Sequence, residues 1–314
     1  MNSRKIIRFG KASFVVSLPK DWLKNNSLQA GDLIYFNQNN ENLVLIPKAI
    51  NKKKELKSIE IDVSKLNIRD IERKIISYYI QNYNIIRIFG KNLNEKSKDI
   101  KDCIQNLMAL EIMEETSEKI VAKDFLKMEE LSPLDLIKRM DIITRAMLLD
   151  TNKIPEENLL ESIYERDRDV NRLTFLVFRI LEYLLKNQSE SSQKGINSKM
   201  ILKYYNISRS IERIGDSAKR IAKLKTKIKF EKRSKEKLEK YFKKLYLNYE
   251  DIMKAFYKND IEKAHRCAHK KRDLVLESKQ LYEDYWKIKN FPIIIEKMKD
   301  LIDSCHNITR DLYN

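Results

Sequence analysis

Residues 156–187 read EENLLESIYERDRDVNRLTFLVFRILEYLLKN, and residues 198–225 read SKMILKYYNISRSIERIGDSAKRIAKLK. In both stretches apolar side chains recur every three or four residues, with charged residues between them. This spacing places the apolar side chains on one face of an α-helix. Both stretches are therefore predicted to be helices of a bundle. Their apolar stripes are Ile163, Val170, Leu173, Val177, Ile180 and Leu184 in the first, and Ile207, Ile211, Ile214, Ala218 and Ile221 in the second.

Helix-start signals divide the rest of the C-terminal half in the same way. Ser132 can cap a helix that has Pro133 at its first position and Asp135 in its first turn. Further starts are predicted near residues 156, 198, 234, 260 and 292. The result is an all-α module of two three-helix bundles, with helices at 133–150, 156–187 and 198–225, then at 234–258, 260–287 and 292–313.

Two smaller modules precede the helices, so the chain is predicted to be multidomain. Residues 1–50 have the pattern of a small β-rich unit, in which Ile6, Phe9, Phe14 and Val16 can share a buried side. So small a unit is expected to pair with a second copy. Residues 56–127 alternate strand and helix and predict a small α/β domain, which we interpret as a spacer, with ligand sensing as the alternative. The predicted boundaries are 1–50, 56–127, 132–230 and 231–314.

Composition restricts the classes of protein to which the chain can belong. No apolar run is long enough to cross a bilayer, and the first residues lack a secretory signal. Three cysteines without C-x-x-C spacing favour neither a disulfide framework nor a thiolate zinc site. A net charge of +17 favours an anionic partner, although a lysine-rich proteome would also produce it. We expect a cytoplasmic protein without membrane insertion.

Four carboxylates on the two quoted helices lie outside the apolar stripes, so packing of the bundle does not explain them. Glu165 and Asp169 lie one helical turn apart, and Glu212 and Asp216 repeat that spacing. Facing helices would bring four negative charges together, and these repel unless a cation binds. Hard oxygen ligands suit iron, zinc, magnesium or manganese. One such pair arises by chance on many helices, so the prediction depends on the equivalent places of both pairs in the repeat.

The N-terminal module is strongly basic. Residues 1–54 hold ten lysines and arginines against three acidic residues. Basic side chains at strand edges can neutralise phosphates and release counterions, which predicts DNA binding. Ordinary solvated lysines are the alternative. A second basic stretch, residues 219–244, has thirteen lysines and arginines against three glutamates, and a solvated helix end accounts for it more simply.

The segments ERDRDVNRL at 165–173 and SIERIGDSA at 210–218 resemble the two signature segments of the PhoU phosphate-uptake regulators. The resemblance covers residues 132–314 as two three-helix repeats. It implies a cytosolic, non-enzymatic regulator of phosphate homeostasis whose acidic motifs hold metal clusters. Carried over by position, the implied ligands are Glu165, Asp169, Glu212 and Asp216.

The second repeat departs from this pattern. The equivalent positions are His269, Asp273, Asp303 and Asn307, so each acidic pair keeps only one carboxylate. His269 and Asp273 also form an i, i+4, i+8 stripe with His265, which could bind a softer metal such as zinc. These residues are weaker candidate ligands, because helix histidines more often face water or stack.

The N-terminal module resembles a second family. The order strand, Ser17-Leu18-Pro19-Lys20, Asp21-Trp22-Leu23, Leu28-x-x-Gly31-Asp32, strand is similar to the AbrB/SpoVT swapped-hairpin DNA-binding domain over residues 3–48. The resemblance implies a homodimer in which two chains interleave their hairpins. It also implies DNA contacts from basic residues of the first strands and loops, here Arg4, Lys5, Arg8 and Lys11. The complete domain order resembles an archaeal type of PhoU protein.

Two functions of different class follow from these patterns. The first is a DNA-binding transcriptional regulator whose helical module senses metal or phosphate. The second is an accessory protein that docks on a phosphate transporter ATPase or a sensor kinase and uses its N-terminal domain only for dimerisation. An enzyme of the di-iron bundle type is disfavoured, because the Glu-x-x-His spacing of that class is absent.

Overall fold

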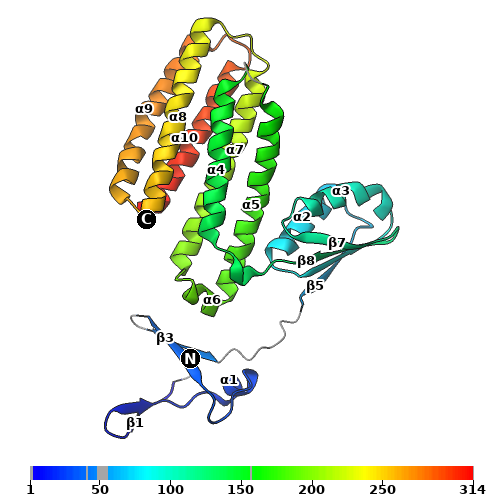
Figure 1. The fold of residues 1–314 in the computed structure, drawn as a ribbon, viewed down its shortest axis with the longest axis vertical. Helices are drawn as coiled ribbons and strands as arrows, with labels where there is room; N and C mark the ends of the chain where they lie inside the picture. The colour runs from blue at the N-terminus through cyan, green and yellow to red at the C-terminus, as the bar shows by residue number, and fades with distance from the viewer. Residues whose placement is uncertain (1–2, 40–41, 48–55, 156–157, 314) are drawn as a thin grey trace. The chain divides into compact units, whose positions relative to one another are not determined.

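The computed structural model describes residues 3–39, 42–47, 56–155 and 158–313, in two units that divide between Glu55 and Leu56 (Figure 1). The first unit holds two hairpins and a short helix. Strand β1 (Ile7–Phe9) pairs antiparallel with β2 (Ser13–Val15), helix α1 spans Lys20–Asn25, and β3 (Ile34–Asn39) pairs antiparallel with β4 (Asn42–Pro47). The unit is β-rich, as predicted for residues 1–50, with the order β-β-α-β-β. Residues 40 and 41, between β3 and β4, lie outside the described residues.

Most apolar strand residues of the first unit are exposed in one copy of the chain, although Leu28 is buried. Ile6, Phe9 and Phe14 are 73%, 69% and 70% exposed, and Val16 is also exposed. The prediction that these four share a buried side is therefore wrong for the single chain. The reason is that two short hairpins and six residues of helix supply no second layer to cover them.

The second unit begins with an α/β domain. Its strands are β5 (Ser58–Asp62), β6 (Ile85–Phe89), β7 (Leu110–Glu115) and β8 (Lys119–Asp124), in the sheet order β5-β6-β8-β7. The β5–β6 pair is parallel and the other two pairs are antiparallel. Helices α2 (Ile68–Ile80) and α3 (Leu93–Gln105) pack on the sheet and enclose a core of isoleucines from both layers. The predicted strand and helix alternation is confirmed.

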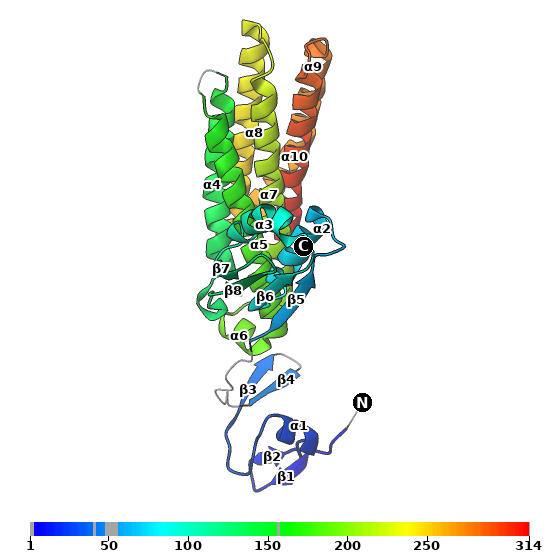
Figure 2. The ribbon, with the colours of Figure 1, turned by 90° about the vertical axis from the view of Figure 1, so that its right-hand side faces the viewer.

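Six long helices form the rest of the unit and run side by side (Figure 2). Their bounds are α4 Pro133–Lys153, α5 Leu160–Lys186, α7 Ser198–Lys225, α8 Lys232–Lys258, α9 Ile261–Tyr285 and α10 Phe291–Tyr313. The cap at Ser132 forms as predicted, because its side chain accepts a hydrogen bond from the Asp135 amide at 3.3 Å. Asp260 caps α9 in the same way, at 2.8 Å from the Lys263 amide. The sequence did not predict the short helix α6 (Gln188–Gln193).

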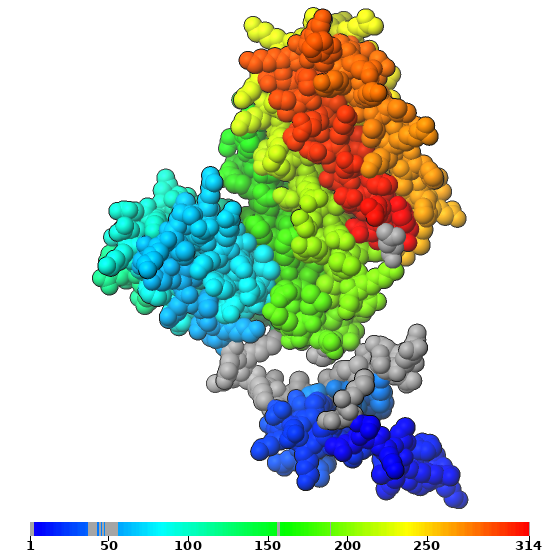
Figure 3. Space-filling view, turned by 180° about the vertical axis from the view of Figure 1, so that it is seen from behind, coloured from blue at the N-terminus to red at the C-terminus, as the bar shows by residue number. Residues whose placement is uncertain are grey.

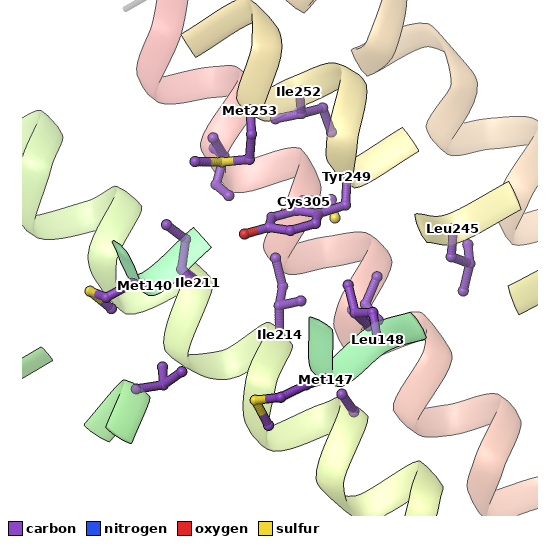
Figure 4. Packing of buried hydrophobic residues seen from close by; sticks show 14 of the residues in the cluster. Met140, Met147, Leu148, Ile211, Ile214, Leu245, Tyr249, Ile252, Met253 and Cys305 are labelled. Atoms are coloured by element: carbon purple, nitrogen blue, oxygen red, sulfur yellow. The ribbon is translucent and has the colours of Figure 1, made fainter. Parts of the chain in front are cut away.

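The six helices share one apolar core rather than two. Met147 of α4, Ile214 of α7, Tyr249 of α8 and Cys305 of α10 all belong to one cluster of buried side chains, and Figure 4 shows them converging. Helix α7 of the first group also packs along α10 of the second. The prediction of two three-helix bundles is corrected accordingly. There are two groups of three helices, but their apolar stripes face each other and form one common core.

The α/β domain is fixed to the helical module by a buried ion pair. Arg179 of α5 is 1% exposed, and its guanidinium contacts both carboxylate oxygens of Asp124, at 3.0 and 2.5 Å. Its Nε also donates to Asn82 Oδ1 at 3.2 Å, and Asn82 Nδ2 donates back to the Arg179 carbonyl at 3.1 Å. Phe175 adds an apolar contact to the α/β core. The α/β domain is therefore docked on α5, and its interpretation as a spacer stays a prediction.

Among the described residues, none of the helices has an apolar stretch of the length that crossing a membrane requires.

Candidate functional site

A cluster of three carboxylates and one lysine lies between α5 and α7. Lys219 Nζ is 2.6 Å from Asp167 Oδ2 and 3.0 Å from Asp216 Oδ1. Glu212, one turn before Asp216, is partly buried beside them. We call Asp167, Glu212, Asp216 and Lys219 the acidic cluster. Two of its carboxylates are those predicted from the sequence on α7, whereas Asp167 was not predicted.

The contribution of α5 to this cluster follows from helical phase. Ile163 and Val170 are buried, and Asp167 lies four residues after the first and three before the second, so it belongs to the same stripe and is 6% exposed. Glu165 lies two residues away from Asp167, which is about 200° around the helix, and is exposed. The structure thus brings Asp167, rather than Glu165, against Glu212 and Asp216.

The remaining predicted residue of this helix, Asp169, is half-exposed. Its carboxylate lies 3.8 Å from Arg172, one turn further along α5. The nearest polar neighbour of Asp167 on its own helix is Asn171, whose Nδ2 lies 3.4 Å from Oδ2. The two polar side chains one turn apart on the side of α5 that faces the acidic cluster are therefore Asp167 and Asn171, rather than Glu165 and Asp169. The roles of Glu165 and Asp169 as metal ligands stay predictions.

The pKa values of Glu212 and Lys219 in the acidic cluster are both raised, for different reasons. Burial raises the pKa of Glu212 above its ordinary value, and the neighbouring carboxylates of Asp216 and Asp167 raise it further. Burial alone would lower the pKa of Lys219, but its contacts with Asp167 and Asp216 outweigh burial, so that pKa is raised. Arg220 adds a second cation at 2.8 Å from Asp216. Arg213, next to Glu212, acts to lower the pKa of that carboxyl, so three cations lie around the three carboxylates of the cluster.

This donor set matches a hard cation in chemistry but not in its present arrangement. Carboxylate oxygens from two helices are the ligands that manganese, magnesium or iron prefer. However, within the described residues no three His, Cys, Asp or Glu side chains are grouped closely enough to hold a metal ion. The Lys219 ammonium occupies the position between Asp167 and Asp216 that a bridging cation would need. A metal would have to displace Lys219 from the cluster.

The candidate residues of the second repeat do not converge. Asp303 pairs with Lys271 at 2.7 Å, while His269 and Asp273 are exposed on α9. His265 stacks on the ring of Tyr313, with 4.5 Å between ring centroids. In the predicted stripe of His265, His269 and Asp273, therefore, His265 stacks on an aromatic ring, whereas His269 and Asp273 are exposed to solvent.

The predicted DNA-binding residues are all accessible in the first unit. Arg4 and Lys5 precede β1, Arg8 lies within it, and Lys11 lies in the turn that follows. All four side chains are exposed. Arg8 donates a long hydrogen bond, 3.5 Å, to the Lys11 carbonyl, which holds these two basic residues at the same end of the hairpin. The four residues present positive charge without a carboxylate between them in the sequence.

Two groups of three long helices share one apolar core, and acidic residues from α5 and α7 meet on its side, which defines a helical-bundle module. Residues 137–224, which cover most of α4, all of α5 and nearly all of α7, match the PhoU domain family. The crystal structure of PhoU from Pseudomonas aeruginosa is similar in fold, with a TM-score of 0.51 and 14% identity. That match covers 57% of this chain and 93% of the other. A search of curated proteins finds no match. The similarity to the PhoU domain family is therefore shown for residues 137–224.

Proposed function

We propose that the protein is a non-enzymatic regulator of phosphate homeostasis that acts through DNA. The observation that carries the regulatory part is the PhoU domain at residues 137–224, together with the PhoU-like fold of the helices. PhoU proteins regulate phosphate uptake, and the sequence resemblance of the acidic segments supports the same role here. The DNA-binding part depends on the first unit, whose basic residues are exposed.

Charge and geometry support DNA as the partner of the first unit. Arg4, Lys5, Arg8 and Lys11 lie on one short hairpin and the segment leading into it, and all four are exposed. Basic side chains so placed can each neutralise one phosphate of a duplex. The resemblance to the AbrB/SpoVT domain supports the same contacts.

The exposed apolar residues of the first unit support a homodimer. Ile7, Phe9, Phe14, Tyr35 and Phe36 are 54–70% exposed, which is unusual for side chains of strands in a folded domain. A second copy whose hairpins interleave with these would bury them. Dimerisation would also double the number of basic residues along one duplex. Light scattering of the purified chain measures this: a dimer is expected, and a monomer at micromolar concentration would contradict it.

The acidic cluster is the site at which we propose that a divalent cation acts. Asp167, Glu212 and Asp216 supply oxygen ligands, and the predicted ligands Glu165 and Asp169 lie on the same stretch of α5. When bound, the metal would supply positive charge that Lys219 supplies otherwise. Exchange of Lys219 for a metal would alter the packing of α5 against α7, which is a change that the rest of the module can sense.

Salt-dependent DNA binding tests the proposal. A dimer that uses all four basic residues of each copy would contact up to about eight phosphates, so the logarithm of affinity should fall with the logarithm of salt with a slope of about −7. Replacement of Arg4, Lys5, Arg8 and Lys11 by glutamine should abolish binding in fluorescence anisotropy. As a matched control, glutamine at Lys235, Lys240, Lys243 and Lys254 removes the same charge from α8, and binding should persist.

Absence of DNA binding by the wild-type chain would remove the DNA part of the proposal. Docking on a phosphate transporter ATPase or a sensor kinase would then be the mode of regulation that remains. Retention of wild-type affinity by the glutamine variant would instead show that DNA binds elsewhere on the chain.

A further inference from the structure

A polar pocket lies between α7 and α10, where the first three helices meet the second three. It is lined by Asn206, Arg209 and Arg213 from α7, and by Asn307, Arg310 and Asp311 from α10. Its volume is about 260 Å³. These two helices lie side by side on the face that Figure 3 shows, in yellow-green and red. The pocket is smaller than the sites of about 300–1,000 Å³ that hold drug-sized ligands, so a small ligand fits it.

The pocket holds more positive charge than its own residues neutralise. Three arginines line it, against the single carboxylate of Asp311. That carboxylate already accepts a hydrogen bond from Asn206 Nδ2 at 3.0 Å. Within the described part of the chain, neither Arg213 nor Arg310 has a carboxylate oxygen within 4.0 Å, although Arg213 acts on Glu212 and Arg310 on Asp311 at longer range. Arg209 is held by the ring of Tyr205, with 5.7 Å from its guanidinium carbon to the ring centroid.

Three exposed arginines that line one small polar space constrain the ligand. Like charges at close range repel, and an anion bound between them would add attractions that offset this repulsion. The planar N–H fork of arginine matches pairs of oxygens on a phosphoryl group, and the amide of Asn307 adds an uncharged donor. A single carboxylate could satisfy one fork, whereas a phosphoryl group presents enough charged oxygens for several. We propose that this pocket binds a small phosphoryl anion, of the class of inorganic phosphate or pyrophosphate.

The position of the pocket gives such binding a structural consequence. Arg209 and Arg213 belong to the first repeat and Arg310 to the second, so one anion would bridge the two halves of the helical module. Arg213 also follows Glu212 directly, which links the pocket to the acidic cluster through one residue of α7. The inference deepens the proposed function, since it names the effector class, and it depends on that function only for its regulatory meaning.

Calorimetric titration of the full-length protein with inorganic phosphate, and separately with pyrophosphate, tests the proposal at constant ionic strength. The wild-type chain should bind at least one of them. Arg213→Gln and Arg310→Gln should each weaken binding by about tenfold or more, as expected when a charge-assisted pair of hydrogen bonds is lost. Arg272→Gln is the matched control, because Arg272 is exposed on α9 and lines no part of the pocket. It removes the same charge and should leave affinity unchanged.

Three results would overturn the proposal: no binding of either anion by the wild-type chain, equal affinity in the Arg213→Gln protein, or an equal loss in the Arg272→Gln control. A DNA titration of the same variants separates the possible sources of phosphoryl oxygens. If Arg213→Gln lowers DNA affinity while the wild-type chain binds neither small anion, the arginines serve the duplex backbone and the proposal is wrong. Because calorimetry is done without DNA, its failure leaves the test of the first unit unaffected.

Discussion

Replacing Arg179 with methionine should destabilise the second unit by about 3–5 kcal/mol, because it leaves a buried charge without a partner. The Asp124 side chain is 2% exposed, and both of its oxygens contact the Arg179 guanidinium. Methionine fills a similar volume, so the loss is mainly electrostatic. The hydrogen bond to Asn82 is lost as well. Urea denaturation followed by circular dichroism measures the free energy of unfolding, and hydrogen exchange in α2 reports whether the α/β domain loosens first.

A double variant makes this prediction sharper. Arg179→Met combined with Asp124→Asn removes both charges but keeps an oxygen that can accept from the Leu126 amide, now at 3.1 Å. The double variant should be more stable than Arg179→Met alone, because replacing a whole buried ion pair is far less damaging than breaking it. Arg73→Met is the control: Arg73 is 77% exposed and its pair with Asp70 should contribute less than about 1 kcal/mol. Additive effects, or a change below about 1 kcal/mol for Arg179→Met, would refute the reasoning.

Three further changes have defined outcomes. Gly90→Ala should destabilise the α/β domain by about 1–3 kcal/mol in the same urea assay, since Gly90 has a φ of +136° and an added Cβ would lie 2.6 Å from Asp62 Oδ1; unchanged stability would contradict this. Burial raises the pKa of Tyr79 to about 12, so between pH 10 and 12 the folded state keeps the phenol proton and the unfolded state loses it. Stability should therefore fall as pH rises through that range. Tyr79→Phe should make this fall shallower, and an identical pH profile in the variant would contradict the prediction. Lys219→Met should lower the melting temperature in the absence of metal, because the acidic cluster loses its internal cation. Addition of manganese to this variant should restore the melting temperature. No response to manganese would count against a cation site there.

The helices could be predicted from sequence because the signals that form them are local. Apolar spacing and the caps at Ser132 and Asp260 depend on residues within one or two turns, and all six long helices are found close to the predicted bounds. The fusion of two bundles into one core could not be predicted, because the spacing of an apolar stripe does not say which stripe it faces. The docking of the α/β domain is similar. Arg179 interrupts an apolar run, which signals a buried charge, but its partner lies 55 residues away.

The sequence predicted the α7 residues of the acidic cluster but not its α5 residue. Glu212 and Asp216 are in the acidic cluster, whereas its α5 member is Asp167. The signal for Asp167 was present, because it falls in register with the buried Ile163 and Val170, while Glu165 does not. The α7–α10 pocket left no such signal, since Arg310 lies about a hundred residues after Arg209 and Arg213, and the contact between the two helices is visible only in the fold.

The regulatory role itself is tested most directly by measuring phosphate uptake, and the messenger RNA of the phosphate transporter, in cells that lack this chain. Deletion should abolish the normal response of both to external phosphate, and the wild-type chain should restore it. A chain with glutamine at Arg4, Lys5, Arg8 and Lys11 should restore neither, whereas the α8 control variant should restore both. An unchanged response to phosphate in cells without the protein would contradict the proposed function.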